Sequence, residues 1–336
     1  MAKRVLLTGG TGFVGANLVR QLLADGPRVH LLVRPGFSPW RLEGIRSHVQ
    51  LHQVTLDDPG LDAVVRRIRP DWVFHLAAHG AYSWQTDVAE IVATNVVGTT
   101  HLVRACLRAG FEAFVNTGSS SEYGFKPHAP TERDWLEPNS HYAVTKASAT
   151  LFCRYTAQRE RVHVPTLRLY SVFGPWEDPG RLFPALVVNG LDGGWPPLVS
   201  PDTARDFVYV EDVCDAYLRA ATVPGQELGA VYNVGRGVQV PLREVVATAQ
   251  QVMGITVTPE WGTMAGRAWD ASVWVADTTA IAAALQWAPQ RDLADGLRRT
   301  MAWMVRRPAR VRRYREGVAA ITATDQPRVA GQGRGR

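Results

Sequence analysis

Tyr142 and Lys146, four positions apart, form the pair in this sequence best suited to acid–base chemistry. They fall in a stretch at 142–157 whose apolar spacing predicts a helix, so the two side chains should lie on one face, a turn apart. A tyrosine phenol has an ordinary pKa of about 10 and needs a nearby cation, such as the Lys146 ammonium, to act as a base. The pattern alone is common, because a packed aromatic beside a lysine stem has the same spacing.

Three serines, Ser119 to Ser121, follow an apolar run at 114–117 that predicts a strand. The carboxyl ends of parallel strands are where open α/β sheets place their chemistry. A serine hydroxyl at that edge can hydrogen-bond a substrate oxygen and pass its proton to Tyr142. A polar turn is the alternative interpretation, and the presence of Tyr142 and Lys146 favours the catalytic one.

A glycine-rich loop, Thr8-Gly9-Gly10-Thr11-Gly12-Phe13-Val14-Gly15, directly follows an apolar run at 5–8. Its spaced glycines allow a tight turn, close approach of backbone N–H groups to a pyrophosphate, and packing of the next helix on the strand. The loop therefore predicts a dinucleotide site, with an unliganded tight turn as the alternative. The predicted cofactor-binding residues here are Gly9, Gly12, Phe13, Val14 and Gly15.

The residue after the second apolar run, 29–33, distinguishes NAD from NADP. A carboxylate there binds the adenosine ribose hydroxyl, whereas a cation favours the 2′-phosphate. The chain has Val33 and then Arg34, with no acid at either position. The cofactor is therefore NAD or NADP, with NADP slightly favoured by Arg34; an exposed arginine at a loop start is the alternative.

Short apolar runs alternate with stretches of helical periodicity through the first half of the chain. The runs are apolar on both sides, as strands of a sheet covered on both faces require. This alternation predicts an α/β fold with a Rossmann-like, doubly wound parallel sheet. The predicted strands are 5–8, 29–33, 72–76 and 114–117, and the predicted helices are 16–24, 61–68, 99–109 and 142–157.

The composition changes at residue 174, where a stretch rich in Gly and Pro begins and continues to 201. We therefore expect an NAD(P)-binding Rossmann domain at 1–173, with about 203–235 packing back onto it. A smaller C-terminal substrate-binding domain is expected mainly at 174–321. The polar, Gly-rich end at 322–336 predicts a disordered tail.

The overall composition is ordinary for soluble domains. The chain has 336 residues, of which 46% are hydrophobic and 20% charged, enough for one large or two closely joined domains. Three cysteines without disulfide or zinc spacing, and nine histidines without paired metal spacing, predict no metal site. An apolar run starting at Val5 leaves no room for a signal peptide, and no window approaches a membrane span. A cytoplasmic location is expected.

The net charge of +6 raises the question of nucleic-acid binding. No nucleic-acid-reading motif accompanies the basic residues, so a solvated face is the favoured interpretation and nucleic acid is not an expected partner. Much of the excess lies in one late stretch, comprising Arg306, Arg307, Arg310, Arg312, Arg313 and Arg315.

Together these motifs resemble the extended short-chain dehydrogenase/reductases, in particular the nucleotide-sugar epimerases, dehydratases and reductases. The resemblance covers about residues 4 to 305, in the order typical of the family. A later stretch, Arg267-Ala268-Trp269-Asp270 followed by Ala276-Asp277, is similar to one in the 4-epimerases. The other segments that carry the resemblance are Thr8 to Gly15, Asp71 to Ala78, Asn95 to Thr99, Ser119 to Gly124, Tyr142 to Lys146, Gly174-Pro175 and Arg205 to Val213.

The resemblance implies a role for each matching residue. Tyr142 would be the acid/base, assisted by Lys146 and Ser119. Arginines suit the paired phosphate oxygens of a nucleotide-sugar. The cofactor site would also include Leu76, Ala77, Ala78, Asn95, Thr117 and Tyr170, and the substrate site Ser119, Ser120, Ser171, Arg205 and Arg267.

The positions after Ser119 argue against a dehydratase. In the family's 4,6-dehydratases the places of Ser120 and Ser121 tend to hold an acid and its partner, and neither is a carboxylate here. Eliminating water needs an acid and a base beyond the tyrosine. Glu122 would enter the acid position if the loop were one residue shorter, but the ungapped count keeps Tyr123 in register.

The leading interpretation is therefore a 4-epimerase of a nucleotide-hexose that works through a keto-sugar, with the Arg267 stretch favouring it. An NADPH-dependent 4-ketoreductase would use the same residues once, with Tyr142 donating the proton, and Arg34 supports it. A non-catalytic NAD(P)-binding scaffold is compatible with the fold alone, but the set Ser119, Tyr142 and Lys146 argues against it. The expected partners are a nucleotide-sugar and a second copy of the chain, as a homodimer.

Overall fold

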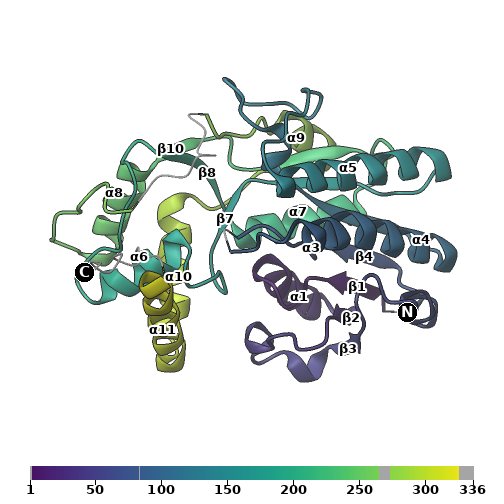
Figure 1. The fold of residues 1–336 in the computed structure, drawn as a ribbon, viewed down its shortest axis with the longest axis horizontal. Helices are drawn as coiled ribbons and strands as arrows, with labels where there is room; N and C mark the ends of the chain where they lie inside the picture. Colours follow the sequence, from purple (N-terminus) through teal and green to yellow (C-terminus); the bar gives the residue numbers. More distant parts are fainter. Residues whose placement is uncertain (1, 83, 265–272, 325–336) are drawn as a thin grey trace, which may run out of the picture.

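The sheet of the first lobe has seven strands in the order β3-β2-β1-β4-β5-β6-β9 (Figure 1). The computed structural model describes residues 2–82, 84–264 and 273–324. Every pairing in this sheet is parallel and the order reverses between β1 and β4, which confirms the Rossmann-like class. The strands are β1 (Arg4–Thr8), β2 (Arg28–Val33), β3 (Gln50–Gln53), β4 (Trp72–His75), β5 (Ala113–Ser119), β6 (Thr166–Leu169) and β9 (Val231–Val234).

Helices cover both faces of this sheet. α1 and α7 pack together on one face, and α2, α4 and α5 form the layer on the other. Because side chains alternate along a strand, Val5 and Leu7 of β1 enter the core under α1 and α7, whereas Leu6 enters the opposite core. The helices are α1 (Phe13–Asp25), α2 (Leu61–Ile68), α4 (Thr99–Ala109), α5 (His141–Glu160) and α7 (Val210–Thr222).

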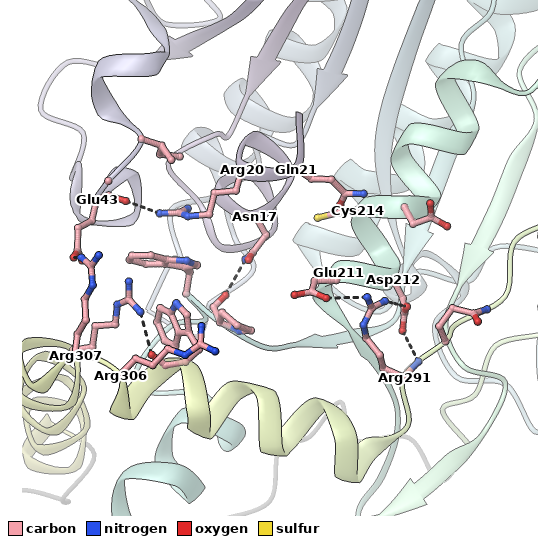
Figure 2. A pocket seen from close by; sticks show the side chains of 18 residues that line it. Asn17, Arg20, Gln21, Glu43, Glu211, Asp212, Cys214, Arg291, Arg306 and Arg307 are labelled. Carbon is pink, nitrogen blue, oxygen red and sulfur yellow. Dashed lines mark hydrogen bonds and ion pairs between the residues drawn. The ribbon is translucent and has the colours of Figure 1, made fainter. Parts of the chain in front are cut away.

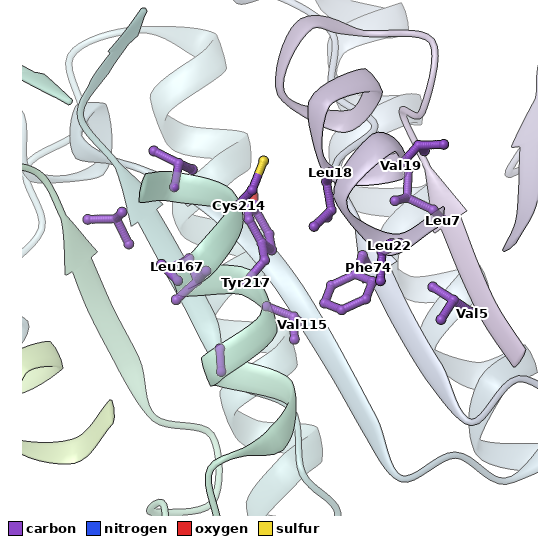
Figure 3. Close-up of a cluster of buried hydrophobic side chains, with 14 of the residues drawn as sticks. Val5, Leu7, Leu18, Val19, Leu22, Phe74, Val115, Leu167, Cys214 and Tyr217 are labelled. Atoms are coloured by element: carbon purple, nitrogen blue, oxygen red, sulfur yellow. The ribbon is translucent and has the colours of Figure 1, made fainter. Parts of the chain in front are cut away.

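The core on the α1 side packs beneath the sheet and fixes α7 against β5 near the carboxyl edge. Tyr217 of α7 is fully buried there, and its hydroxyl lies 2.6 Å from Thr117 Oγ1 at the end of β5. The helix is thus tied to the strand that leads into the serine segment. Figure 3 shows the packed side chains of this core, which include Val5, Leu7, Leu18, Val19, Leu22, Phe74, Val115, Leu167, Cys214 and Tyr217.

A second lobe is built around a mixed sheet in the order β10-β8-β7, with β7 parallel and β10 antiparallel to β8. It has a core of its own, in which Phe173 stacks on Phe183 with ring centroids 4.0 Å apart. No helix in the described part of the chain is long and apolar enough to cross a membrane. The elements are β7 (Ser171–Phe173), α6 (Leu182–Leu191), β8 (Ala204–Tyr209), β10 (Gln239–Pro241), α8 (Leu242–Met253), α10 (Leu293–Val305) and α11 (Pro308–Thr324), with α9 (Thr279–Leu285) beside β9.

The predicted elements of the first lobe are present, and the helices predicted at 61–68 and 99–109 have the observed bounds of α2 and α4. The Gly- and Pro-rich segment 174–201 contains α6, which sequence analysis did not predict. The tail expected from 322 is helical through Thr324, and its remainder lies outside the described residues. The domain limits themselves stay a prediction.

Candidate active site

The glycine loop turns tightly between β1 and α1. Gly9 has a φ of +71°, and a Cβ added there would lie 2.6 Å from the backbone of Leu76. A Cβ on Gly15 would collide with the carbonyl oxygen of Gly9, so the first turn of α1 packs on the loop only without a side chain. Gly12 precedes the helix without a capping side chain, which leaves the N–H groups of the first turn available to a ligand. These features fit a pyrophosphate.

A buried polar chain fixes the loop after β4, where Ala77 and Ala78 are predicted to line the cofactor cleft. Thr8 Oγ1 lies 2.7 Å from His75 Nδ1 and accepts the Ala77 N–H at 3.2 Å. His75 Nε2 lies 2.8 Å from Thr99 Oγ1. Burial lowers the pKa of His75 to about 3, so its ring is neutral at physiological pH and acts as a structural bridge.

Asn95 links the same loop to α5. It lies in a π-helical turn, Ala93–Gly98, between α3 (Val88–Val92) and α4. Its side chain accepts the His79 N–H at 2.9 Å and donates to the His79 carbonyl at 2.8 Å and to Thr145 Oγ1 at 2.9 Å. Asn95 therefore holds the loop after β4 against α5, the helix that carries Tyr142.

Ser119 and Tyr142 contact each other at the carboxyl edge of the sheet, and Lys146 contacts strand β5. Lys146 is buried, and its Nζ donates a 2.5 Å hydrogen bond to the Thr117 carbonyl at the end of β5. Burial raises the pKa of Tyr142 to about 12, and a hydrogen bond with the Ser119 side chain acts in the opposite direction. The pKa of Lys146 is lowered by burial. The structure thus places Ser119 against the phenol of Tyr142, with Lys146 one helical turn further along.

Ser119 also begins the 3-10 turn Ser120–Tyr123. Its Oγ accepts the Ser121 N–H at 3.2 Å and donates to Ser121 Oγ at 3.1 Å. Glu122 accepts the Ser119 N–H at 2.8 Å, which completes a reciprocal capping box. This local arrangement holds the Ser119 hydroxyl at the sheet edge, and Ser120 beside it is also buried.

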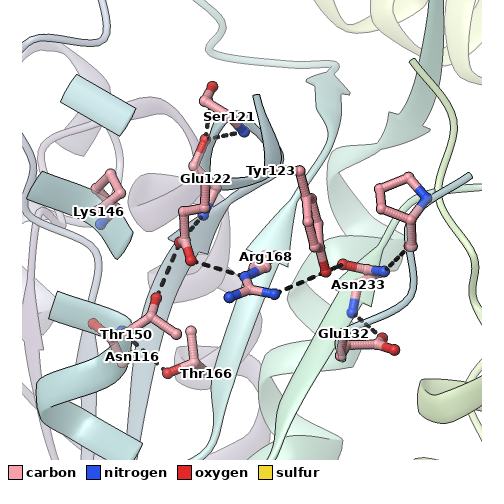
Figure 4. Close-up of polar contacts among 12 residues, drawn as sticks. Asn116, Ser121, Glu122, Tyr123, Glu132, Lys146, Thr150, Thr166, Arg168 and Asn233 are labelled. Carbon is pink, nitrogen blue, oxygen red and sulfur yellow. Dashed lines mark hydrogen bonds and ion pairs between the residues drawn. The ribbon is translucent and has the colours of Figure 1, made fainter. Parts of the chain in front are cut away.

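Glu122 forms a fully buried ion pair behind the serines (Figure 4). Arg168 Nε donates to Glu122 Oε2 at 2.8 Å, and Thr150 Oγ1 donates to the other carboxylate oxygen at 3.0 Å. Arg168 also donates to the Tyr123 hydroxyl, which in turn donates to Asn233 Oδ1 at 2.7 Å. Both oxygens of Glu122 are therefore engaged, and this carboxylate supports the serine segment from inside the protein.

Gly118 allows this pair to form. A Cβ at that position would lie 2.8 Å from Glu122 Oε1 and 3.0 Å from Arg168 Cγ. The backbone of β5 can pass over the buried charges only because residue 118 has no side chain.

Arg34 lies just beyond β2 with its side chain 71% exposed. Its Nη1 is 4.0 Å from Glu90 Oε1, and Glu90 is also 3.3 Å from His79 Nε2. Asn95 binds the backbone of His79, so the contacts of Arg34 place its side chain at the same edge of the sheet as the predicted cofactor cleft. An exposed guanidinium with one long ionic contact can readily turn toward a phosphate.

Two of the predicted substrate residues, Ser171 and Arg205, come from the second sheet, whereas Ser119 and Ser120 lie at the end of β5. Ser171 opens β7, and Arg205 on β8 stacks over the Trp274 ring at 5.0 Å. Tyr170, predicted to bind cofactor, is buried, and its hydroxyl has no hydrogen-bond partner within the described ranges. Arg267 lies outside the described residues.

Two side chains near Tyr142 were not predicted. The guanidinium of Arg181 lies 4.7 Å over the ring of Tyr82, and its Nη2 donates to the Ala81 carbonyl at 3.1 Å. Burial dominates the pKa of Tyr142, and of the smaller effects Arg181 lowers it while Tyr82 raises it. Arg181 precedes α6 and Tyr82 follows β4, so no local pattern in the sequence could have joined them to the site.

The arrangement is suited to proton transfer next to a dinucleotide. With a pKa of about 12, set mainly by burial, Tyr142 holds its proton at neutral pH and can donate it to a substrate oxygen. Removing a proton instead requires added positive charge near the phenol. Oxidised NAD, when bound, supplies both that charge and a hydride acceptor.

Comparison with known proteins points to one family. The model of the NAD-dependent epimerase/dehydratase family matches residues 5–235. The chain is 32% identical to a UDP-glucose 4-epimerase of Mycolicibacterium smegmatis over 310 residues, covering 89% of this chain and 97% of that protein. It is 31% identical to a dTDP-glucose 4,6-dehydratase of Streptomyces griseus over 317 residues, covering 90% of this chain and 94% of that protein.

Among solved structures, the UDP-glucuronic acid 4-epimerase of Bacillus cereus in complex with UDP-glucuronic acid and NAD is similar to this chain. The TM-score is 0.79 at 25% identity, with 90% of this chain and 99% of that protein covered. Similarity thus extends through both lobes.

Proposed function

This chain belongs to the NAD-dependent epimerase/dehydratase family of extended short-chain dehydrogenase/reductases, and on that premise we propose that it interconverts C4 epimers of a nucleotide-hexose. NAD, which the glycine loop Gly9 to Gly15 would hold, would supply the hydride acceptor, and Tyr142 would take the proton of the C4 hydroxyl, so that a 4-keto-sugar would form. The keto-sugar would then rotate within the site and present its opposite face. Return of the hydride to the opposite face would be accompanied by return of the proton from Tyr142, so the net redox change would be zero.

The observation that favours this reaction over dehydration is that both carboxylate oxygens of Glu122 are hydrogen-bonded inside the protein. Dehydration at C5 and C6 needs an acid and a base in addition to Tyr142. The positions after Ser119 that would supply them hold Ser120 and Ser121, and neither is a carboxylate. Glu122, the carboxylate nearest in sequence, is fully buried and bonded to Ser119, Thr150 and Arg168. Proton transfer by Tyr142 with Ser119 and Lys146 remains the chemistry available.

The reaction can be tested on purified protein with UDP-glucose or dTDP-glucose, the sugar nucleotides named for its relatives, and catalytic NAD. We expect the corresponding galactose nucleotide to form, with no net NADH by absorbance. A 4-keto-6-deoxy product would show that the protein is a dehydratase. Failure to convert either compound, with stoichiometric NADPH consumption on a 4-keto-sugar, would replace the epimerase with a reductase.

The reductase is the second candidate because Tyr142 is protonated in the unliganded site. Burial raises its pKa to about 12, which suits a group that donates a proton once to a keto oxygen. Preference for NADP would accompany this role, with Arg34 as the partner of the 2′-phosphate.

Replacing Arg34 by Asp should shift cofactor preference toward NAD, because a carboxylate accepts the ribose hydroxyls and repels the 2′-phosphate. The measurement is the ratio of the Kd values for NADPH and NADH. Arg28→Asp, at the other end of β2, is the matched control and should leave that ratio unchanged. An unchanged ratio in the Arg34 variant would remove this side chain from the cofactor site.

We assign the diphosphate of the substrate to Arg205, with Ser171 on the adjoining strand.

A homodimer is supported by apolar side chains that α5 leaves exposed, Val144, Leu151 and Tyr155. Sedimentation of wild type and of Leu151→Glu would test the homodimer, with dissociation expected for the variant.

The three buried, unpaired cysteines are compatible with a cytoplasmic location.

A further inference from the structure

A cavity of about 920 Å³ lies at the junction of the two lobes (Figure 2). We call it the junction cavity. Its walls come from α1, the segment 43–45, the Pro175-Trp176 turn, the start of α7, residues 290–291 and the segment 303–310. None of the residues assigned above to catalysis, cofactor or substrate lines it, so its chemistry is separate from that of Tyr142.

One end of the junction cavity is strongly basic. Arg307 pairs with Glu43, which is the acidic lining residue at this end. Glu43 gives its backbone carbonyl to Arg20 at 2.9 Å. The basic side chains there are Arg20, Arg306, Arg307 and Arg310, so four guanidinium groups share one carboxylate.

Aromatic rings hold two of these guanidinium groups in place. Arg20 lies 4.1 Å and Arg310 4.9 Å from the centroid of the Trp176 ring, and Arg310 is also 4.5 Å from Trp303. Arg310 Nη1 donates to the Trp303 carbonyl at 3.1 Å, whereas its buried Nε has no partner in the described part of the chain. Stacking orders these groups without neutralising them.

Burial and neighbouring positive charge both act on the pKa values of these arginines. Burial, followed by the charge of Arg310, lowers the pKa of Arg20 to about 10. Burial also lowers the pKa of Arg310; Glu43 opposes this effect, whereas Arg307 and Arg306 act in the same direction as burial. The fold thus gathers positive charges that disfavour one another, an arrangement that an anion would relieve.

The opposite end of the junction cavity is acidic, because Arg291 lies there among Glu211, Asp212 and Asp215. Arg291 donates to Asp212 at 2.6 Å and lies 3.0 Å from Glu211. Figure 2 shows this group on α7 and the adjoining chain, across the cavity from Arg20 and Arg307. An anionic ligand is therefore directed to the basic end.

We propose that the basic end of the junction cavity binds the phosphate chain of a nucleotide or of an inorganic oligophosphate. Guanidinium forks match phosphate oxygens, and three uncompensated charges call for at least two phosphate groups. The volume falls within the roughly 300–1,000 Å³ typical of small-molecule sites. Because Arg20 belongs to the first lobe and Arg306 and Arg310 to the second, the ligand joins the lobes and raises the melting temperature.

The arginine stretch at 306–315 is largely exposed, as predicted for a solvated face, and Arg307 is an exposed residue paired with Glu43. Arg310 is the exception, because it is partly buried and packs on two tryptophans. Arg312 is exposed and does not line the cavity, which makes it a matched control on the same helix.

Calorimetry with tripolyphosphate and ADP tests the proposal on the full chain saturated with NAD, which keeps UDP, the nucleotide expected at Arg205, out of the measurement. We expect Arg306→Gln and Arg310→Gln each to weaken binding by about tenfold or more, and Arg312→Gln to change it less than twofold. Glu43→Gln should tighten binding, since it removes the competing carboxylate. Tighter binding of a nucleotide than of tripolyphosphate would identify nucleotides as the source, and equal binding would assign recognition to the phosphate chain alone.

Three outcomes would overturn the site. These are the absence of binding, an equal loss in Arg312→Gln, and a loss of binding in Arg205→Ala, which would place the ligand in the substrate site. Melting of each variant without ligand verifies folding, and the exposed Arg306 provides a test that does not disturb the tryptophan packing.

Discussion

Replacing Tyr142 with Phe should lower turnover by about 10²-fold or more, because a positioned general acid–base contributes roughly 10²–10⁴-fold. The substitution removes the hydroxyl that lies against Ser119 and keeps the ring that fills the site. Cofactor affinity should be largely retained, since the glycine loop and Asn95 hold their geometry without the phenol. The measurement is kcat for the nucleotide-sugar, with the Kd for cofactor determined separately.

Tyr155 provides the matched control on the same helix. It is 57% exposed and its hydroxyl accepts a hydrogen bond from Arg159 at the surface. Tyr155→Phe keeps the ring assigned above to the dimer face and removes only the hydroxyl bonded to Arg159, so wild-type turnover is expected. If Tyr142→Phe also turned over normally, the assignment of the proton to this residue would be lost, whatever the product of the reaction.

Arg168→Met should destabilise the protein by about 3–5 kcal/mol, the usual cost of leaving one partner of a buried ion pair alone. Arg168 is 3% exposed and its partner Glu122 is fully buried, so water cannot replace the lost contact. Chemical denaturation measures the free energy of unfolding. Activity at low temperature should fall as well, because Glu122 holds the backbone of Ser119.

A double-mutant cycle distinguishes this pair from simple loss of packing. The variant Glu122→Gln with Arg168→Met should be less destabilised than the sum of its single changes, since no buried charge remains unpaired. Arg299→Met, which removes an exposed pair with Asp295, should leave stability near that of wild type. Strict additivity of the first two changes would show that the charges contribute independently.

Local signals in the sequence were sufficient for much of the fold. The apolar spacing of α2 and α4 lies between breakers, with Gly60 before one helix and Gly110 after the other, and both bounds were predicted. The strand β6 was missed because it is short and contains Arg168, which interrupts an apolar run. Its burial is possible only through Glu122, 46 positions earlier, and no local pattern reveals that pairing.

The site residues also divide into those that local sequence signals reveal and those that only the fold brings together. The glycine loop and the spacing of Tyr142 and Lys146 are local, so they could be recognised directly. The Ser-x-x-Glu capping box at Ser119 and Glu122 is also local, and it would have identified Glu122 as a backbone partner. Arg181 and Tyr82 could not be predicted, because the fold brings them together from opposite lobes.

The crowding at Gly118 constrains how this protein can evolve. A Cβ there would lie 2.9 Å from Thr166 Cγ2 as well as against Glu122 and Arg168, so substitution at 118 is blocked while these three side chains remain. A chain that lost only one of the two charges would be destabilised, and position 118 would still face the side chains that stayed. Among descendants of this sequence, positions 118, 122 and 168 should change together or stay fixed, however freely the surrounding surface diverges.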